Sequence, residues 1–102
     1  MIYCPCASAE EALRLGRGIV ERKMAACVNI LPQMTSAYWW EGTVQEALEA
    51  VLILKTFPAF RESVVQEIKK QHSYAVPAIL CWEVGSGNEQ FTAWMRQNLP
   101  HD

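Results

Sequence analysis

Two extended runs separated by a tight turn constrain the fold of this chain more than any other feature. The runs Thr35–Glu41 and Val44–Thr56 flank a turn at Gly42, and both are rich in strand-forming residues. Extended runs joined by a short turn that contains glycine are typical of a β-hairpin. The second run includes four consecutive apolar residues, Val51–Leu54, as expected of a strand that is covered on both faces. The sequence therefore predicts a long hairpin whose second strand is covered on both sides.

The segments outside this hairpin alternate between strands and helices. Apolar residues recur every three to four positions in the helical segments, and short apolar runs bounded by Pro, Gly or Ser mark the strands. The expected elements are strands at Met1–Cys4, Ala26–Leu31 and Ala78–Val84, helices at Ala9–Met24 and from Pro58 to Lys70, and a C-terminal helix capped by Asn88.

Local signals set the expected boundaries of these elements. Pro5 has no backbone N–H, so we expect regular pairing of the first strand to stop or bulge there. Ser8 and Glu11 fit a capping box, in which Ser8 is the N-cap and Glu11 reaches back to it. Pro32 is expected to end the strand before the hairpin, and His72–Pro77 is predicted to form a loop.

The order of elements is β-α-β-β-α-β followed by a helix. That order indicates an α+β, ferredoxin-like fold with an antiparallel sheet. The chain has 102 residues, so we expect one domain over 1–102. The two main helices would cover one face of the sheet and leave the other face bare.

Trp39 and Trp40 raise the question of what covers the bare face of the sheet. Successive side chains of a strand point to opposite faces, so one indole should face each way. Burying a tryptophan removes about 150–250 Å² from water, which is about 4–6 kcal/mol at most. We expect the helical layer to cover one indole and a second copy of the chain to cover the other. The alternative is one half-exposed tryptophan lying on the surface.

Composition narrows the classes of partner and the compartment. The net charge of −2 and a pI near 5.7 argue against a nucleic-acid partner. No apolar run is long enough for a transmembrane helix, and the first residues do not resemble a secretory signal. We therefore expect a cytoplasmic protein without a membrane partner, with its cysteines as free thiols. The cysteines are Cys4, Cys6, Cys27 and Cys81.

Cys4-Pro5-Cys6 is the strongest candidate for a metal-binding site. Two thiols at i and i+2 of an extended segment share one face, and soft thiolates select Cu(I) or Zn. Two ligands cannot close a tetrahedral zinc site, and both cysteines could instead be small buried apolar residues. His72 is a tentative third ligand, although its place after the lysines of a helix end already accounts for an imidazole there.

Glu49 and Lys55 are charged residues within the long apolar strand. They are six positions apart and therefore share a face. A charge in a covered strand needs a partner, so an ion pair or a bond between subunits is one interpretation. The other is the wall of a cleft, with Tyr74, that binds a small anion or a metal complex.

Four blocks of sequence resemble one known family. They are Ala25-Ala26-Cys27-Val28-Asn29-Ile30, Tyr38-Trp39-Trp40-Glu41-Gly42, Ile53-Leu54-Lys55-Thr56 and His72-Ser73-Tyr74-Ala75-Val76-Pro77. In this order and spacing the chain resembles the CutA family of divalent-cation tolerance proteins. The resemblance implies a ferredoxin-like fold similar to that of PII signalling proteins, and a homotrimer with Trp39 and Trp40 at the interface. It also implies that Cys4 matches a cysteine implicated in copper binding, and that Glu49 and Lys55 match polar positions.

The chain departs from the family pattern in its loop. Family members usually read His-Pro-Tyr-Glu-Val-Pro-Glu, whereas Ser73 replaces the first proline, and Ala75 and Ala78 replace the two glutamates. Any role of those carboxylates, including metal ligation, is absent here. The N-terminal strand is also a few residues shorter than usual.

Three functions follow from these observations. The first is a homotrimer that acts in the response to divalent metals, above all copper, by binding or signalling and without a required cofactor. The second is a PII-like module that binds a small molecule and has no physiological metal. The third and weakest is an enzyme that uses Cys27 or His72, because the sequence contains no Gly-rich phosphate loop, His-Glu-x-x-His motif, serine elbow or carboxylate dyad. The prediction is therefore a protein that is not an enzyme.

Overall fold

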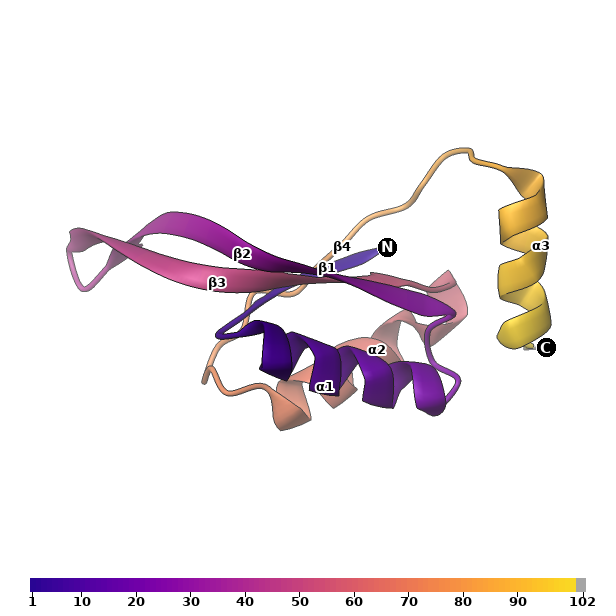
Figure 1. The fold of residues 1–102 in the computed structure, drawn as a ribbon, viewed down its shortest axis with the longest axis horizontal. Coiled ribbons are helices and arrows are strands. Elements are labelled where there is room, and N and C mark those ends of the chain that lie inside the picture. The colour runs from indigo at the N-terminus through magenta and orange to yellow at the C-terminus, as the bar shows by residue number, and fades with distance from the viewer. Residues whose placement is uncertain (101–102) are drawn as a thin grey trace.

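A four-stranded antiparallel sheet in the order β2-β3-β1-β4 forms the frame of the protein. The computed structural model describes residues 1–100. Helices α1 and α2 lie on one face of the sheet, and α3 stands beyond one end of it (Figure 1). The elements are β1 Ile2–Cys6, α1 Ala9–Glu21, β2 Cys27–Trp40, β3 Thr43–Lys55, the 3₁₀ turn Pro58–Phe60, α2 Arg61–Gln71, β4 Leu80–Cys81 and α3 Glu89–Asn98. The predicted α+β, ferredoxin-like fold with its long hairpin and C-terminal helix is confirmed.

The first strand continues through Pro5, which corrects the expected stop. Pro5 pairs with Val51 inside the β1–β3 ladder. In an antiparallel sheet, the N–H and C=O groups of one residue point towards the same neighbouring strand. The Pro5 carbonyl points away from β3 and is bonded to the His72 ring. The missing N–H therefore falls on the side where β4 has already ended, since β4 pairs only with Ile2 and Tyr3.

Other predicted boundaries also shift. The two runs on either side of Pro32 form one strand, and the proline lies in the register shift between Leu31 and Met34. Helix α1 ends at Glu21 rather than Met24, because Lys23 takes a positive φ of 63°. Strand β4 has two residues instead of the seven expected, although Trp82 and Met1 still exchange backbone bonds of 3.0 and 2.8 Å.

The core lies between the sheet and the two helices on its covered face. Alternate residues of β1 and β3 point into it, so Cys4 pairs with Leu52 and both side chains are fully buried. Helix α1 approaches closely at Gly16, where an added Cβ would lie 2.8 Å from Leu52 Cδ1 and 2.9 Å from Val28 Cγ2. Helix α3 is attached separately, through Met95, Leu99 and their neighbours.

The capping box at the start of α1 forms with one change. Ser8 Oγ accepts the Glu11 N–H at 3.1 Å, as predicted. Glu11 Oε1, however, accepts the Ala7 N–H at 2.9 Å instead of the Ser8 N–H. The predicted Asn88 cap of α3 is confirmed, with Asn88 Oδ1 accepting the Gln90 N–H at 2.9 Å.

The two tryptophans lie near the tip of the hairpin, beyond the helices (Figure 1). Trp39 pairs with Val44 and Trp40 pairs with Thr43, so the indoles face opposite sides of the ribbon, as predicted. Trp39 is 75% exposed and Trp40 is 60% exposed. The expectation that the helical layer covers one indole is therefore wrong, and self-association cannot be argued from a single uncovered indole.

Candidate functional site

The candidate site is a cluster of two thiols and one imidazole. Within residues 1–100, Cys4, Cys6 and His72 are the one group of three metal-capable side chains that come together, with their ligand atoms within 4.8 Å of one another. Cys4 and Cys6 share a face of β1, and His72 is the residue at which α2 ends. The structure thus brings together the three residues that the sequence analysis considered as metal ligands.

Strand and helix geometry explain this convergence. Residues i and i+2 of a strand point to the same face, so both thiols enter the core, where each is fully buried. Helix α2 crosses the same face and ends beside β1, where the His72 N–H closes its last turn on the Ile68 carbonyl at 2.8 Å. The imidazole is half-buried and is the most accessible of the three ligands.

Both ring nitrogens of His72 already have partners. Nδ1 accepts the Tyr74 N–H at 3.0 Å, so it carries no proton. Nε2 lies 2.8 Å from the Pro5 carbonyl oxygen and therefore donates to it as the neutral tautomer. The ring also packs against the Tyr74 ring, with centroids 4.7 Å apart. Metal ligation through Nε2 would require this imidazole to give up its bond to Pro5.

The two thiols influence each other. The hydrogen bond with Cys6, together with burial, raises the pKa of the Cys4 thiol far above its usual range. The same bond lowers the pKa of the Cys6 thiol, against the opposing effect of burial. Each sulfur also lies near a backbone carbonyl oxygen, Cys4 Sγ at 3.6 Å from that of Pro5 and Cys6 Sγ at 3.7 Å from that of Cys4. A soft cation would bind both sulfurs as thiolates and displace their protons.

Glu11 ties the loop after α2 to the start of α1. Its carboxylate accepts the Ser73 N–H at 2.8 Å through Oε2 while Oε1 holds Ala7. Burial opposes ionisation, but the hydrogen bonds from Ser73 and Ala7 lower the pKa of Glu11 below its ordinary value. The sequence analysis missed this contact with Ser73, since the only signal for Glu11 was the capping box.

Tyr74 and Glu49 meet next to this cluster. The Tyr74 hydroxyl donates to Glu49 Oε2 at 2.7 Å. Burial, and then this bond to a carboxylate, raise the pKa of Tyr74 above its ordinary value. Lys55 does not join them, because it lies six residues further along β3, about 20 Å away, with its ammonium 5.3 Å from the Phe91 ring. The three residues considered for a ligand cleft are therefore divided between two places.

Cys27 lies away from His72. It pairs with Lys55 in the sheet, whereas His72 contacts Pro5, which pairs with Val51. The structure does not bring these two residues together as a nucleophile and base.

Comparison with known proteins gives a consistent result. A sequence profile described as "CutA1 divalent ion tolerance protein" matches residues 1–98. The divalent-cation tolerance protein CutA of Archaeoglobus fulgidus is 38% identical over 98 residues, covering 96% of this chain and 95% of that protein. Protein CutA 1, chloroplastic, of rice is 35% identical over 98 residues, and this chain spans 55% of its length.

Solved structures agree with these relatives. The A. fulgidus structure, described as a periplasmic divalent cation tolerance protein, superposes with a TM-score of 0.92 over 96% of this chain and 95% of its own, at 37% identity. Rice CutA1 superposes with a TM-score of 0.94 at 34% identity, over 99% of this chain and 93% of its own. On these matches, the chain belongs to the CutA1 divalent ion tolerance protein family.

Proposed function

We propose that this protein acts in the response to divalent metals by binding metal rather than by catalysis, with copper as the ion. Cys4, Cys6 and His72 are the proposed ligands. The observation that carries the proposal is the convergence of their three ligand atoms within 4.8 Å. The names of the relatives describe cation tolerance rather than a reaction, which is consistent with a binding role.

The spacing of the donors suits one soft ion. Metal–sulfur bonds of about 2.3 Å and metal–nitrogen bonds of about 2.0–2.1 Å place donors about 3.5–4 Å apart around a shared ion. Movements of an ångström or less would bring the present cluster to that spacing. Two thiolates and one imidazole are a soft set that favours Cu(I) over Mg²⁺ or Ca²⁺. Rotation of His72 away from Pro5 would open the cluster to an incoming ion.

We also propose a homotrimer. The outer half of the hairpin carries exposed apolar side chains on both sides, since Trp39 and Val44 share one face while Tyr38 and Trp40 share the other. Exposed apolar patches of this kind mark interaction surfaces. A twofold contact would cover one face of the ribbon, whereas in a closed ring of three copies each hairpin lies between two neighbours.

The compartment proposed for this protein is the cytoplasm, because a reducing setting keeps Cys4 and Cys6 as thiols. No helix within residues 1–100 is long and apolar enough to cross a membrane. The relatives' names include both a chloroplast and a periplasm, so the fold is not tied to one compartment.

Competition with a Cu(I)-specific chelator, under anaerobic reducing conditions, tests the metal proposal. We expect one Cu(I) per chain in the parent and no stoichiometric binding in the Cys4→Ala/Cys6→Ala variant. Cys81→Ala is the matched control, because Cys81 is exposed and outside the cluster. Far-UV circular dichroism identifies any variant that fails to fold. Unchanged Cu(I) affinity in a folded Cys4→Ala/Cys6→Ala variant would refute the site.

Light scattering at micromolar concentration tests the assembly. We expect about three times the chain mass of 11.6 kDa for the parent, and a shift towards the single-chain mass for Trp39→Ser/Trp40→Ser. Trp94→Ser is the control, because Trp94 is exposed on α3, far from the hairpin tip. A parent of single-chain mass would contradict the trimer.

A further inference from the structure

A cavity of about 530 Å³ lies between the end of β3, the chain from Trp82 to Asn88, and α3. It exists because α3 is attached at its C-terminal end, through Met95 and the C-cap residue Leu99, so its N-terminal half stands away from the sheet (Figure 1). A volume of this size is within the range of small-molecule sites. The cavity is remote from the Cys4–Cys6–His72 cluster and shares no residue with it.

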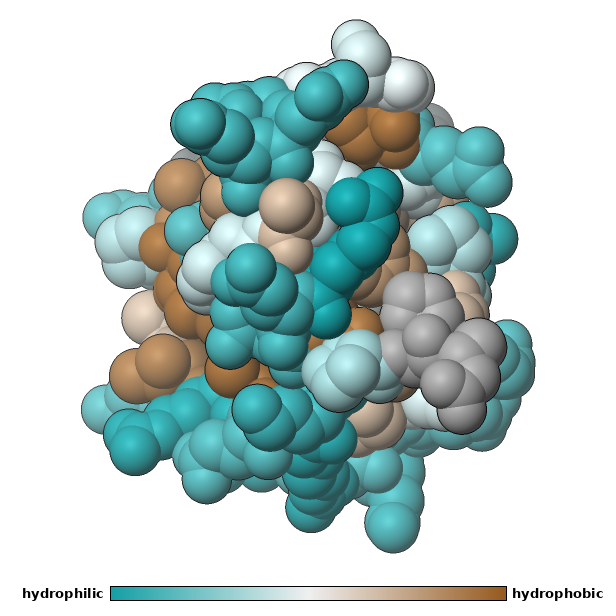
Figure 2. Space-filling view, turned by 90° about the vertical axis from the view of Figure 1, so that its right-hand side faces the viewer, coloured by the Kyte–Doolittle hydropathy of each residue, from teal (hydrophilic) through white to brown (hydrophobic). Residues whose placement is uncertain are grey.

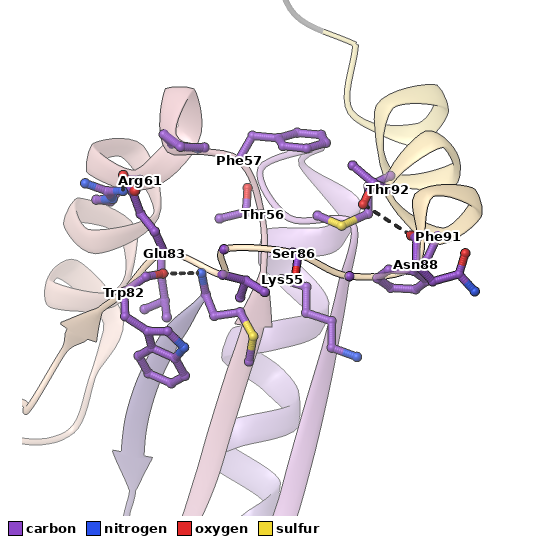
Figure 3. Close-up of a pocket in the computed structure, with 17 residues that line it drawn as sticks. Lys55, Thr56, Phe57, Arg61, Trp82, Glu83, Ser86, Asn88, Phe91 and Thr92 are labelled. Carbon is purple, nitrogen blue, oxygen red and sulfur yellow. Dashed lines mark hydrogen bonds and ion pairs between the residues drawn. The ribbon is translucent and has the colours of Figure 1, made fainter.

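Apolar and aromatic side chains form much of the wall. Figure 3 shows Arg61, Glu83 and Trp82 on one side of the cavity and Phe91 with Thr92 on the other. Seen from the α3 end, the surface of the molecule is mostly hydrophilic, with apolar side chains showing in patches between polar ones (Figure 2). Aromatic wall residues such as Trp82 and Phe91 could hold a flat apolar ligand.

Lys55 carries the one side-chain charge of this lining that has no opposite charge beside it. Arg61 is paired with Glu83 at 3.7 Å, so these two largely cancel. Within residues 1–100, no carboxylate forms an ion pair with the Lys55 ammonium, which instead lies 5.3 Å from the Phe91 ring centroid. Lys55 is also partly buried. A partly buried cation without a counter-charge, set in an aromatic wall, favours an anion in the cavity.

The N-terminus of α3 is not needed for this argument. Asn88 Oδ1 already accepts the Gln90 N–H at 2.9 Å, so the helix supplies its own cap. The cations that a ligand would meet are the Lys55 ammonium and the N-terminal ammonium of Met1, which also lines the cavity and donates to the Trp82 carbonyl at 2.8 Å.

We infer that this cavity binds a small organic anion with a flat apolar body, such as an aromatic carboxylate. Its carboxylate pairs with the Lys55 ammonium and its ring packs against Phe91 and Trp82. The site does not depend on the metal proposal, and it would give the protein a second ligand of a different chemical class.

Calorimetric titration of the full chain with naphthalene-2-carboxylate tests the inference, and naphthalene-2-carboxamide is the neutral counterpart. We expect the carboxylate to bind and the amide to bind about tenfold or more weakly, the loss expected when a charge-assisted hydrogen bond is removed. Lys55→Met keeps the length and the apolar stem of the side chain, so it should weaken the carboxylate about tenfold or more while leaving the amide unchanged.

Two further measurements locate the site. Lys70→Met is the matched control, because Lys70 is exposed on α2, and it should leave both affinities unchanged. Amide NMR shifts caused by the carboxylate should concentrate at Ser86, Phe91 and Thr92. The inference is overturned by no binding at millimolar ligand, by equal affinities for the two probes, by an unaffected Lys55→Met variant, or by shifts confined to the hairpin tip. Loss of Cu(I) binding in the cysteine variant would leave these results unchanged, so the two proposals fail separately.

Discussion

His72 Nε2 lies 2.8 Å from the carbonyl oxygen of Pro5, and the two residues are 67 positions apart in the chain. The bond joins the end of α2 to the strand that carries both buried thiols. It also occupies the one carbonyl of β1 that a continued β4 would otherwise take. The His72 imidazole therefore binds the exposed edge of β1 and also lies next to Cys4 and Cys6, where the proposed metal would bind.

Replacing His72 should lower stability even without metal. His72→Ala removes the bonds to Pro5 and Tyr74, and it leaves a partly buried carbonyl acceptor without its partner, so the free energy of unfolding should fall by about 1 kcal/mol. Urea denaturation of metal-free protein measures this loss. Lys69→Ala, an exposed change on the same helix end, should stay within about 0.5 kcal/mol of the parent. Equal stability of parent and His72→Ala would show that the imidazole serves no structural role.

The Glu11 carboxylate should make stability depend on pH. Its pKa is lowered from an ordinary value of 4.5, so its contribution is present above that value and is lost as pH falls through its lower folded pKa. Glu11→Gln should cost about 1.5–3 kcal/mol at neutral pH, as expected for bonds to a charged group, and the difference from the parent should shrink in acid.

Urea denaturation of both proteins at neutral pH and at about pH 3 measures this difference. Glu10→Gln is the control, because Glu10 is exposed and next to Glu11 in the same helical turn. A stability difference that stays constant between the two pH values would contradict the role given to Glu11.

Tyr74 should ionise above the ordinary tyrosine value of 10.0, because it is partly buried and donates to Glu49. Ultraviolet titration of the phenols measures this pKa, and its absence in Tyr74→Phe assigns the transition. Glu49→Gln removes the carboxylate and should bring the Tyr74 pKa closer to its ordinary value. Tyr74→Phe should also cost about 1 kcal/mol at neutral pH. An unchanged Tyr74 transition in Glu49→Gln would contradict the pairing.

Two glycines of α1 should respond oppositely to alanine. Gly16→Ala places a Cβ within 3.0 Å of Leu52 and Val28 side chains, so overpacking should cost about 1–3 kcal/mol. Gly18→Ala meets nothing within 4 Å and should stabilise the helix by about 0.5–1 kcal/mol. Thermal denaturation of the two variants compares them directly. A neutral or stabilising Gly16→Ala would contradict the close approach of α1 to the sheet.

Features that depend on near neighbours in the chain were predictable from the sequence. The long hairpin, both main helices, the Asn88 cap and the opposite directions of Trp39 and Trp40 follow from periods of two or 3.6 residues and from bonds that span a few positions. These geometries are repeated in every protein, so residue order is sufficient to determine them.

Other features required the positions of segments that are distant in sequence. A proline is tolerated at position 5 of β1 because β4 ends before it reaches Pro5, and because His72 binds the Pro5 carbonyl. Both indoles are exposed because the hairpin is longer than the helices that cover the sheet. Lys55 is separated from Glu49 because the length of the strand between them exceeds the reach of either side chain.

By itself, the sequence determined which residues form strands and helices and which side chains share a face, because backbone periodicity is local. Only the tertiary structure decided that His72 meets Cys4 and Cys6, and that Lys55 lines a separate cavity. Those outcomes depend on where each strand ends and where each loop returns, which is set by packing across the whole core.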